Sequence, residues 1–132
     1  SVKKLNRFNA SPKSTSIEKF NNKVPKNKVV NFQGFRSICP VTSQPDWGNI
    51  YLHSTSHSMD STKLIKFLKS YRNRGDFHEA CIESIFVTVL EDFVINDLTV
   101  YGKFLRRGGI DINPIRSTSK KLLFNNFRDF NQ

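Results

Sequence analysis

The sequence predicts an α+β domain in which an antiparallel four-stranded sheet carries two helices on one face. Short segments of alternating apolar and polar residues occur in two pairs, one before and one after a central stretch. That central stretch has apolar residues at helical spacing, interrupted once. The order of elements is therefore β-β-α-α-β-β, and a chain of 132 residues fits one domain.

The first 30 residues differ from the rest in charge. They hold eight Lys or Arg and one acid, whereas residues 31–132 hold 13 basic and 10 acidic residues. Their apolar residues are scattered without periodicity. We therefore expect a basic flexible leader or linker over 1–30, the folded domain over 31–119 and a C-terminal tail over 120–132. No apolar run approaches the ~18 residues of a membrane span, which excludes an integral membrane protein.

Two strands are predicted before the helices. Lys28–Ile38 alternates weakly, and we expect a kink at Gly34. Cys39–Gly48 contains two prolines and ends in glycine, which predicts a structured loop. Asn49–Ser54 alternates again and is the second strand, followed by a polar turn over Thr55–Met59.

Two helices are predicted next. Asp60 or Ser61 can cap the first helix, whose apolar residues recur at helical spacing from Leu64 onward. Asp76 can cap the second helix, which continues to about Phe93. This second helix is the most apolar part of the chain, and we expect it to be the central element of the core.

Two further strands follow the helices. Leu98–Leu105 is the third strand, and Arg106–Gly109 is a turn with two glycines. Ile110–Ile115 is a fourth strand or an edge strand, because Pro114 cannot donate a hydrogen bond to a neighbour. A two-layer domain of this kind has two open sheet edges and one uncovered face, so we expect an oligomer.

Cys39 and Asp46 are the first candidates for chemistry. A thiol becomes a useful nucleophile when its pKa is lowered, and a nearby acid can pass a proton to the group that the sulfur attacks. The alternative for Cys39 is a small buried hydrophobe. A loop with two prolines is more constrained than a simple connection requires, which favours the functional interpretation.

His78 and Glu79 lie in the first turn of the second predicted helix. The Glu79 carboxylate can accept N–H groups of a purine-like ring, while the alternative for both residues is a structural role at the helix N-terminus. Arg106 and Arg107 can bind phosphate, or can belong to an exposed turn. The histidines and cysteines have no metal-ligand spacing, and we expect no metal.

Three motifs follow one another along the chain: CPVTSQPDWG (Cys39–Gly48), SYRNRGDFHEAC (Ser70–Cys81) and VYGKFLRRGGIDINPIRS (Val100–Ser117). Together they resemble the 7-cyano-7-deazaguanine reductases, the NADPH-dependent nitrile reductases of queuosine biosynthesis, which have the tunnelling fold. The resemblance runs from about residue 35 to residue 119. It implies reduction of a nitrile to a primary amine with two NADPH, in the cytoplasm, as part of tRNA modification.

The resemblance also assigns roles to residues. Cys39 would add to the nitrile and form a covalent thioimide, and Asp46 would donate the proton. Glu79 would bind the edge of the deazaguanine ring, with His78 in the same pocket assisting proton movement. The implied substrate is the small molecule 7-cyano-7-deazaguanine, and neither a membrane nor nucleic acid is an expected partner.

One motif of the family is missing. The E-S-K-S-x-K string associated with NADPH binding is absent, and the corresponding place reads MDSTKLIKFL (Met59–Leu68), which keeps Ser61 and Lys63. The remaining candidate contacts to the cofactor phosphates are Arg106, Arg107 and Gly108. The amino-acid sequences of the DWG and RRGGIDINP segments are similar to those in the C-terminal module of the long, two-module form of the family. We therefore expect a catalytic half that forms a homo-oligomer or pairs with an N-terminal-type module.

Two other functions stay open. One is an amidinotransferase, which forms the same thioimide but adds ammonia to a nitrile already in tRNA, and the missing cofactor motif favours it. The other is a non-catalytic fragment that binds deazaguanine or RNA, for which the basic leader is the only direct support.

Overall fold

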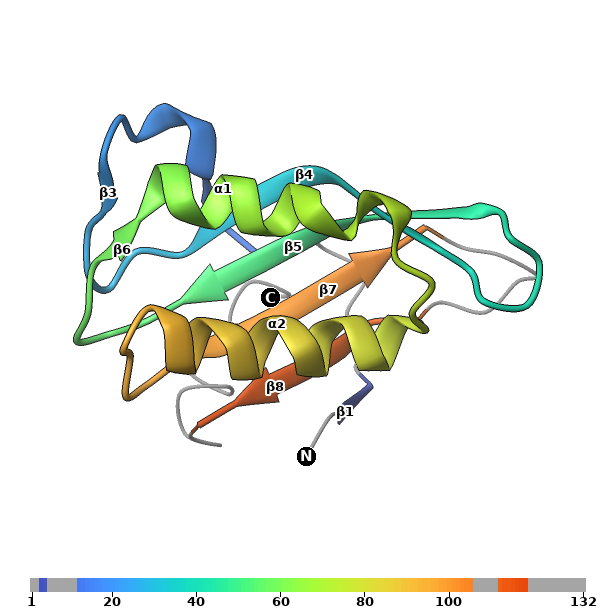
Figure 1. Cartoon of the computed structure of the whole chain (residues 1–132). Helices are drawn as coiled ribbons and strands as arrows, with labels where there is room; N and C mark the ends of the chain where they lie inside the picture. The colour runs from blue at the N-terminus through green and yellow to red at the C-terminus, as the bar shows by residue number, and fades with distance from the viewer. Residues whose placement is uncertain (1–2, 5–11, 106–111, 119–132) are drawn as a thin grey trace.

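The computed structural model describes residues 3–4, 12–105 and 112–118. One layer is a sheet with the strand order β1-β8-β7-β5-β4-β2. The helices α1 (Ser61–Lys69) and α2 (His78–Asp92) lie side by side across one face of this sheet (Figure 1). The predicted α+β class and the placement of both helices on one face are confirmed.

Four strands form the body of the sheet and pair antiparallel, the fourth of which overlaps its predicted range only at Pro114 and Ile115. They are β4 (Val30–Ile38), β5 (Pro45–His53), β7 (Thr99–Phe104) and β8 (Pro114–Ser117). Two short strands extend it, β1 (Lys3–Lys4) antiparallel to β8 and β2 (Thr15–Ser16) parallel to β4. The sheet therefore has six strands rather than four, and one of its pairings is parallel. The short strands β3 (Lys23–Val24) and β6 (Met59–Asp60) pair separately.

The expectation of a flexible leader over residues 1–30 is wrong for residues 12–30. The 3₁₀ helix η1 (Ile17–Lys19) places Ile17 in the core, and Val24 is also fully buried. The Ser61 backbone N–H donates to the Asn22 carbonyl at 3.0 Å, which ties this segment to the start of α1. Single apolar residues without periodicity can fill a core when tertiary contacts hold their segment in place. Residues 1–2, 5–11 and the tail over 120–132 lie outside the described residues.

The kink expected at Gly34 is a β-bulge. Phe32 pairs with Ile50 and Phe35 with Gly48, so β4 has one more residue than β5 between these pairs. Gly34 takes a φ of +74°, a conformation that glycine adopts without strain. The extra residue reverses the alternation, and Phe32 and Phe35 are therefore both buried in the core under the helices.

The two helices begin differently. The Asp60 carboxylate accepts from the Lys63 backbone N–H at 2.9 Å, so the predicted cap of α1 is confirmed. The predicted cap at Asp76 is wrong, because α2 starts after Phe77 without a side-chain cap. Asp76 instead forms an ion pair with Arg74 at 3.0 Å in the connection after the 3₁₀ helix η2 (Ser70–Asn73).

The core lies between the sheet and the helices, and α2 is its central element as predicted. Its buried residues are Cys81, Ile82, Ile85, Phe86 and Val89. The opposite face of the sheet is not wholly bare, since Tyr51, Tyr101 and Ile115 form a second buried cluster. Within the described ranges, no helix has the length and apolar content needed to cross a bilayer.

Candidate active site

The loop between β4 and β5 carries the candidate nucleophile. It is shorter than predicted, because Pro45 begins β5 and pairs with Ile38. A proline is tolerated at the first position of a strand. The loop closes on itself, since the Cys39 N–H donates to the Gln44 carbonyl at 2.8 Å and the Cys39 carbonyl accepts from the Ser43 N–H at 2.9 Å. These two bonds fix the backbone that carries the thiol.

The Cys39 thiol is half-buried, and its surroundings favour the thiolate. The hydrogen bond from the Thr42 side chain is the largest cause that lowers the pKa of Cys39, followed by the backbone N–H groups of Thr42 and Val41. Partial burial and the Asp46 carboxylate act in the opposite direction. The sequence argument did not single out Thr42. The only sequence signal for Thr42 is its distance from Cys39, because Ser and Thr side chains often form hydrogen bonds with groups two or three residues away. Many Ser and Thr residues meet this condition.

Asp46 and His78 are distant in sequence but meet beside this loop. Asp46 lies on β5 and is only 4% exposed, and its Oδ2 is 3.4 Å from His78 Nε2. His78 is the first residue of α2, and its ring packs against Phe104 with centroids 4.3 Å apart. A carboxylate and an imidazole are thus close together and largely shielded from solvent, an arrangement that suits proton transfer.

A glycine makes room for this packing. Gly48 lies two residues after Asp46 on β5, opposite Phe104 on β7. A Cβ at Gly48 would lie 2.8 Å from the Phe104 ring, which is closer than van der Waals contact allows. Phe104 can therefore lie across Gly48 and against His78.

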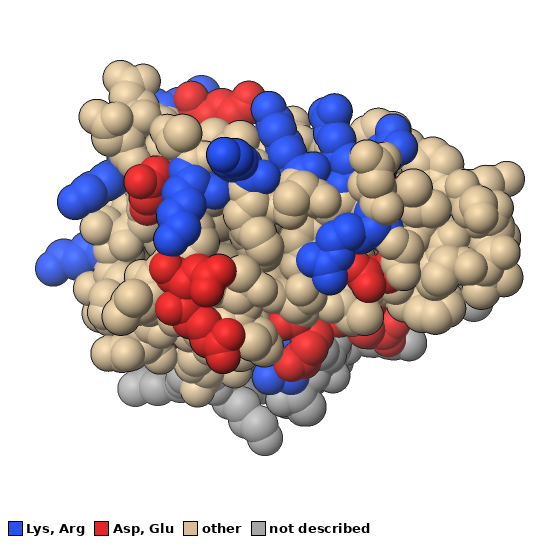
Figure 2. Space-filling model, viewed as in Figure 1, with Lys and Arg blue, Asp and Glu red and all other residues tan. Residues whose placement is uncertain are grey.

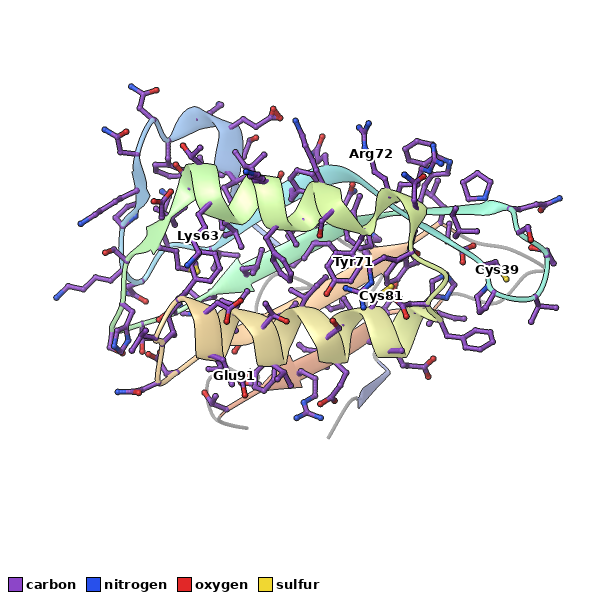
Figure 3. The ribbon with its side chains drawn as sticks, in the orientation of Figure 1. Cys39, Lys63, Tyr71, Arg72, Cys81 and Glu91 are labelled. Carbon is purple, nitrogen blue, oxygen red and sulfur yellow. The ribbon has the colours of Figure 1, made fainter. Side chains whose placement is uncertain are left out.

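The connection before α2 brings His78 to the loop. The Ile38 N–H donates to the Arg74 carbonyl at 2.8 Å, immediately before Cys39. The Arg74 guanidinium stacks over the Tyr71 ring at 4.3 Å. This connection therefore joins the end of β4 to the start of α2. Figure 3 shows Cys39 in the loop at this end of the molecule, with Tyr71 and Cys81 in the interior.

Cys81 is a packing residue. It is fully buried, and burial is the main cause that raises the pKa of its thiol to about 11. Its Sγ lies 3.9 Å from the Asp76 carbonyl. The two cysteines are not bonded to each other, and only Cys39 has the exposure and the lowered pKa of a nucleophile.

Glu79 is partly buried in the first turn of α2, next to His78, at the end of the helix where the sequence analysis predicted it. The candidate phosphate contacts Arg106, Arg107 and Gly108 fall outside the described residues. Across 3–4, 12–105 and 112–118, no three His, Cys, Asp or Glu side chains gather closely enough to hold a metal ion.

An apolar rim lies at this end of the sheet, and the sequence analysis missed it. We define it by four exposed side chains: Val41, Trp47, Phe77 and Leu105. They come from the Cys39 loop, the start of β5, the residue before α2 and the end of β7. Trp47 and Leu105 lie on the face of the sheet opposite Asp46 and Phe104, where they line a hollow of about 240 Å³ together with Gly34, Gly48 and Asn49. A patch of this kind is typical of a surface that another molecule covers.

The QueF-like protein family matches residues 45–122, a range that includes Asp46, His78 and Glu79 and begins after Cys39. Among curated proteins, the chain is similar to the NADPH-dependent 7-cyano-7-deazaguanine reductase of Coxiella burnetii. The two are 47% identical over 97 residues, which is 74% of this chain and 35% of the relative. The reductase of the same name from Burkholderia cenocepacia is 35% identical over 125 residues, 95% of this chain and 45% of the relative. The chain thus spans less than half the length of these relatives.

A solved structure has the same fold. The archaeosine synthase QueF-Like in the apo form superimposes with a TM-score of 0.58 over 74% of this chain and 94% of that chain. The sequences are 16% identical, so this likeness supports the fold alone. The tunnelling fold expected from the three motifs is confirmed.

Proposed function

The chain belongs to the QueF-like protein family, and on that premise we propose that it carries the nucleophilic half of a nitrile reductase. Its substrate is 7-cyano-7-deazaguanine, and the product is 7-aminomethyl-7-deazaguanine, within queuosine tRNA modification. The observation that carries the proposal is the meeting of Cys39, Asp46 and His78 at one end of the sheet, beside Glu79.

In the first step, the Cys39 thiolate adds to the nitrile carbon. A carbon–sulfur bond forms, one π bond of the nitrile breaks, and its nitrogen takes a proton. Asp46 is the proton donor, and His78, 3.4 Å away, returns a proton to it. The product of this step is a covalent thioimide on Cys39. Thr42 keeps the sulfur anionic before the attack and has no part in the proton transfer.

Glu79 recognises the substrate ring. A carboxylate can accept two N–H bonds from the 2-amino-pyrimidinone edge of the deazaguanine. Such a bidentate contact discriminates by about 1–3 kcal/mol in the comparable case of base recognition. Its place in the first turn of α2, next to His78, would put the ring edge and the reacting nitrile in one pocket.

NADPH is the proposed reductant, as the names of the relatives suggest. The described residues do not form a complete site for it. The hollow beside Trp47, about 240 Å³, is smaller than an ordinary cofactor pocket, and no Lys or Arg lines it. We propose that Arg106, Arg107 and Gly108 contact the phosphates.

A second protein unit completes the site. The exposed apolar side chains at this end of the sheet support this, as does the chain's span of 35–45% of these two relatives. The unit is either another copy of the chain or an N-terminal-type module. We propose a cytoplasmic location, where NADPH is available and thiols are kept reduced.

Intact mass spectrometry with 7-cyano-7-deazaguanine tests the proposal. We expect one substrate mass to add to the protein and Cys39→Ala to abolish the adduct. Cys81→Ala is the matched control and should keep it, because Cys81 is buried. NADPH is added afterwards, and clearance of the adduct with release of the amine would establish a reductase.

Other outcomes would change the assignment. If ammonia clears the adduct and NADPH does not, the chain is an amidinotransferase and the reductase proposal fails. If no adduct forms in the presence of an N-terminal-type module, the chain shares the fold of the family but does not carry out the proposed reaction. An adduct that survives Cys39→Ala would move the chemistry to another residue.

A further inference from the structure

A row of cations covers the outer side of α1 and continues onto the segment before the sheet. Figure 2 shows Lys and Arg side chains along this edge of the molecule, above the acidic side chains over α2. We call this surface the basic face and define it by five exposed residues: Lys19, Lys23, Lys66, Lys69 and Arg72. Arg72 projects away from the helix layer (Figure 3).

The fold joins two parts of the sequence into this surface. Lys19 ends η1 and Lys23 lies on β3, and both elements pack beside α1. The Ser61 hydroxyl donates to the Phe20 carbonyl at 3.0 Å, which holds the segment against the helix start. Part of the charge that the sequence analysis assigned to a flexible leader is therefore fixed in one place, next to the charge of α1.

No acid lies on α1 or η2, and the acids near this surface are Glu18, beside Lys19 on η1, and Asp60 on β6, opposite Lys23. Ser61–Asn73 contains four Lys or Arg and no Asp or Glu, whereas α2 contains four acids and no Lys or Arg. Among described residues, the structure records no ion pair for any of the five residues of the basic face. The excess of positive charge along Lys66, Lys69 and Arg72 raises the local potential and attracts a polyanion.

The spacing of the cations suits a row of phosphates. Lys66 and Lys69 are three residues apart on α1, which is about 4.5 Å along the helix axis, and Arg72 follows on the 3₁₀ helix η2. One strand of a duplex carries a phosphate about every 3.4 Å of its axis. The aromatic residues nearby are not available for stacking on bases, because Tyr71 is buried and Phe67 is partly buried.

We propose that the basic face binds the phosphate backbone of a nucleic acid without regard to base sequence. A second copy of the chain is a poorer fit to this surface. On α2, Glu83 already pairs with Arg116 and Glu79 belongs to the candidate site, which leaves Glu91 and Asp92 for docking. Two acids match five cations less well than a row of phosphates does. The proposal is independent of the nitrile chemistry.

Fluorescence anisotropy with labelled oligouridylate and oligothymidylate of equal length tests the proposal. We expect both to bind, with affinity falling as salt rises by about 0.7 log units per log unit of salt for each contacted phosphate. The triple variant Lys66→Gln, Lys69→Gln, Arg72→Gln should weaken binding at least about tenfold and reduce the salt slope by about 2. The charge-matched control Lys13→Gln, Lys26→Gln, Lys28→Gln should bind within about twofold of wild type.

Three results would overturn the proposal. Equal losses of oligonucleotide affinity in the two triple variants would show that binding depends on the net charge of the protein and not on the basic face. Binding to vesicles with anionic lipid but not to either oligonucleotide would assign the surface to a membrane. Self-association without nucleic acid, lost in the first triple variant and followed by light scattering, would assign it to a second copy. Melting temperatures and Cys39 alkylation rates check that both variants are folded, and these do not depend on the proposed substrate.

Discussion

The two ends of the sheet each hold an aspartate whose oxygen lies 3.4 Å from a histidine nitrogen. At one end Asp46 meets His78 beside the Cys39 loop. At the other end Asp97, just before β7, meets His57 in the connection after β5. The same two side-chain types stand in different surroundings, and the surroundings separate a structural pair from one suited to chemistry.

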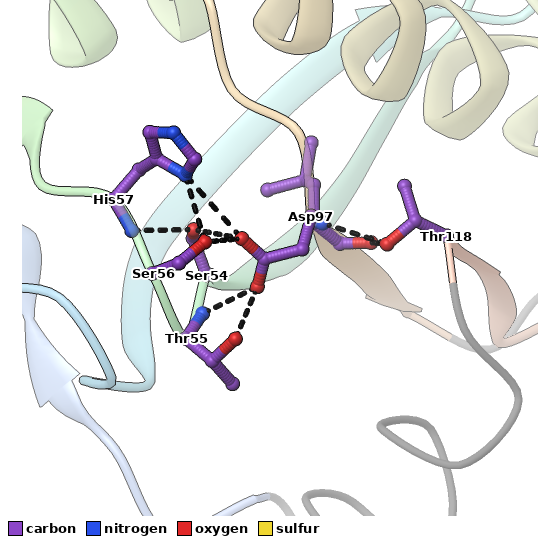
Figure 4. A network of polar contacts seen from close by, with 7 residues as sticks. Ser54, Thr55, Ser56, His57, Asp97 and Thr118 are labelled. Atoms are coloured by element: carbon purple, nitrogen blue, oxygen red, sulfur yellow. Dashed lines mark hydrogen bonds and ion pairs between the residues drawn. The ribbon is translucent and has the colours of Figure 1, made fainter.

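The Asp97 carboxylate is satisfied by its own loop (Figure 4). It accepts hydrogen bonds from the Ser54, Thr55 and Ser56 hydroxyls and from the Thr55 N–H. Partial burial opposes ionisation, but the bonds from Ser56 and Thr55 hold the pKa of Asp97 well below its usual range. The carboxylate therefore stays charged and joins the loop after β5 to the loop before β7.

Asp46 is more deeply buried than Asp97 and lies between His78 and the thiol loop. The end of the sheet that holds Asp46 exposes apolar side chains, while the loop around Asp97 is polar. One end of the sheet is held together by hydrogen bonds within its own loops, and the other carries the proposed nucleophile and the proposed proton donor. We expect substitutions at the Asp97 end to change stability and substitutions at the Asp46 end to change reactivity.

Asp97→Ala should have the largest effect on stability. It leaves three hydroxyls and one N–H without their shared acceptor, and a hydrogen bond to a charged group contributes about 1.5–3 kcal/mol net. In this partly exposed loop, water replaces part of the lost acceptor. We expect the free energy of unfolding to fall by about 3 kcal/mol in urea titrations. Asp92→Ala, an exposed acid at the end of α2, is the control and should change it by less than about 0.5 kcal/mol. Equal losses of unfolding free energy in the two variants would show that the Asp97 hydrogen bonds add no particular stability.

Gly102→Ala tests the packing beneath the site. A Cβ there would lie 2.7 Å from Ile82 Cδ1 and 2.8 Å from Phe104 Cε2, so the side chains must shift. We expect the free energy of unfolding to fall by about 1–3 kcal/mol. Gly75→Ala is the matched control, because its Cβ would have no neighbour closer than 3.9 Å. Similar melting temperatures for both variants would show that Phe104 is loosely held.

Thr42→Val should slow the reaction of Cys39 with iodoacetamide several-fold near neutral pH. The variant removes the hydroxyl that does most to lower the pKa of Cys39, so less thiolate is present at a given pH. The pH profile of alkylation should move upward, while stability changes little because the loop is exposed. Thr42→Ser keeps the hydroxyl and should behave as wild type. An unchanged profile for Thr42→Val would leave the backbone N–H groups as the main cause.

We expect a small effect of pH on the stability of the fold through His53, which lies close to Asn27. His53 Nε2 donates to Asn27 Oδ1 at 3.1 Å, and burial lowers the pKa of His53. The unfolded chain then binds a proton below about pH 6.5 that the folded chain does not, so stability falls as pH drops through that value. The melting temperature should be a few degrees lower at about pH 5.5 than at about pH 7.5. This difference should shrink in His53→Gln and persist in His57→Gln.

The parts of the fold with strong local signals were predicted correctly. The apolar stripe of α2, the Asp60 cap and the irregularity at Gly34 each depend on a few neighbouring residues. Cys39, Asp46 and His78 were named from their motifs, and the structure places them at one end of the sheet. The motifs gave no distances, and the pairing of Asp46 with His78 follows only from the register of β5 against β7 and α2.

The parts that were missed depend on tertiary contacts. Burial of Ile17 comes from its place between α1 and β4, which no pattern in a polar segment indicates. Pro45 was assigned to a loop, yet it begins β5, because only the pairing with Ile38 decides where the strand starts. Asp76 was expected to cap α2, but Arg74 competes for its carboxylate.

One comparison tests the account most directly: adduct formation and thermal melting of Asp46→Asn and Asp97→Asn, measured side by side. Both variants keep the size of the side chain. Asp46→Asn removes the acid that is the proposed proton donor, and Asp97→Asn removes the charged acceptor of the loop hydrogen bonds. Adducts with 7-cyano-7-deazaguanine are followed by intact mass, well below both melting temperatures. We predict that Asp46→Asn slows adduct formation at least about tenfold with little change in melting temperature, and that Asp97→Asn does the reverse. Equal adduct rates for Asp46→Asn and wild type, or a slower rate for Asp97→Asn than for Asp46→Asn, would contradict it.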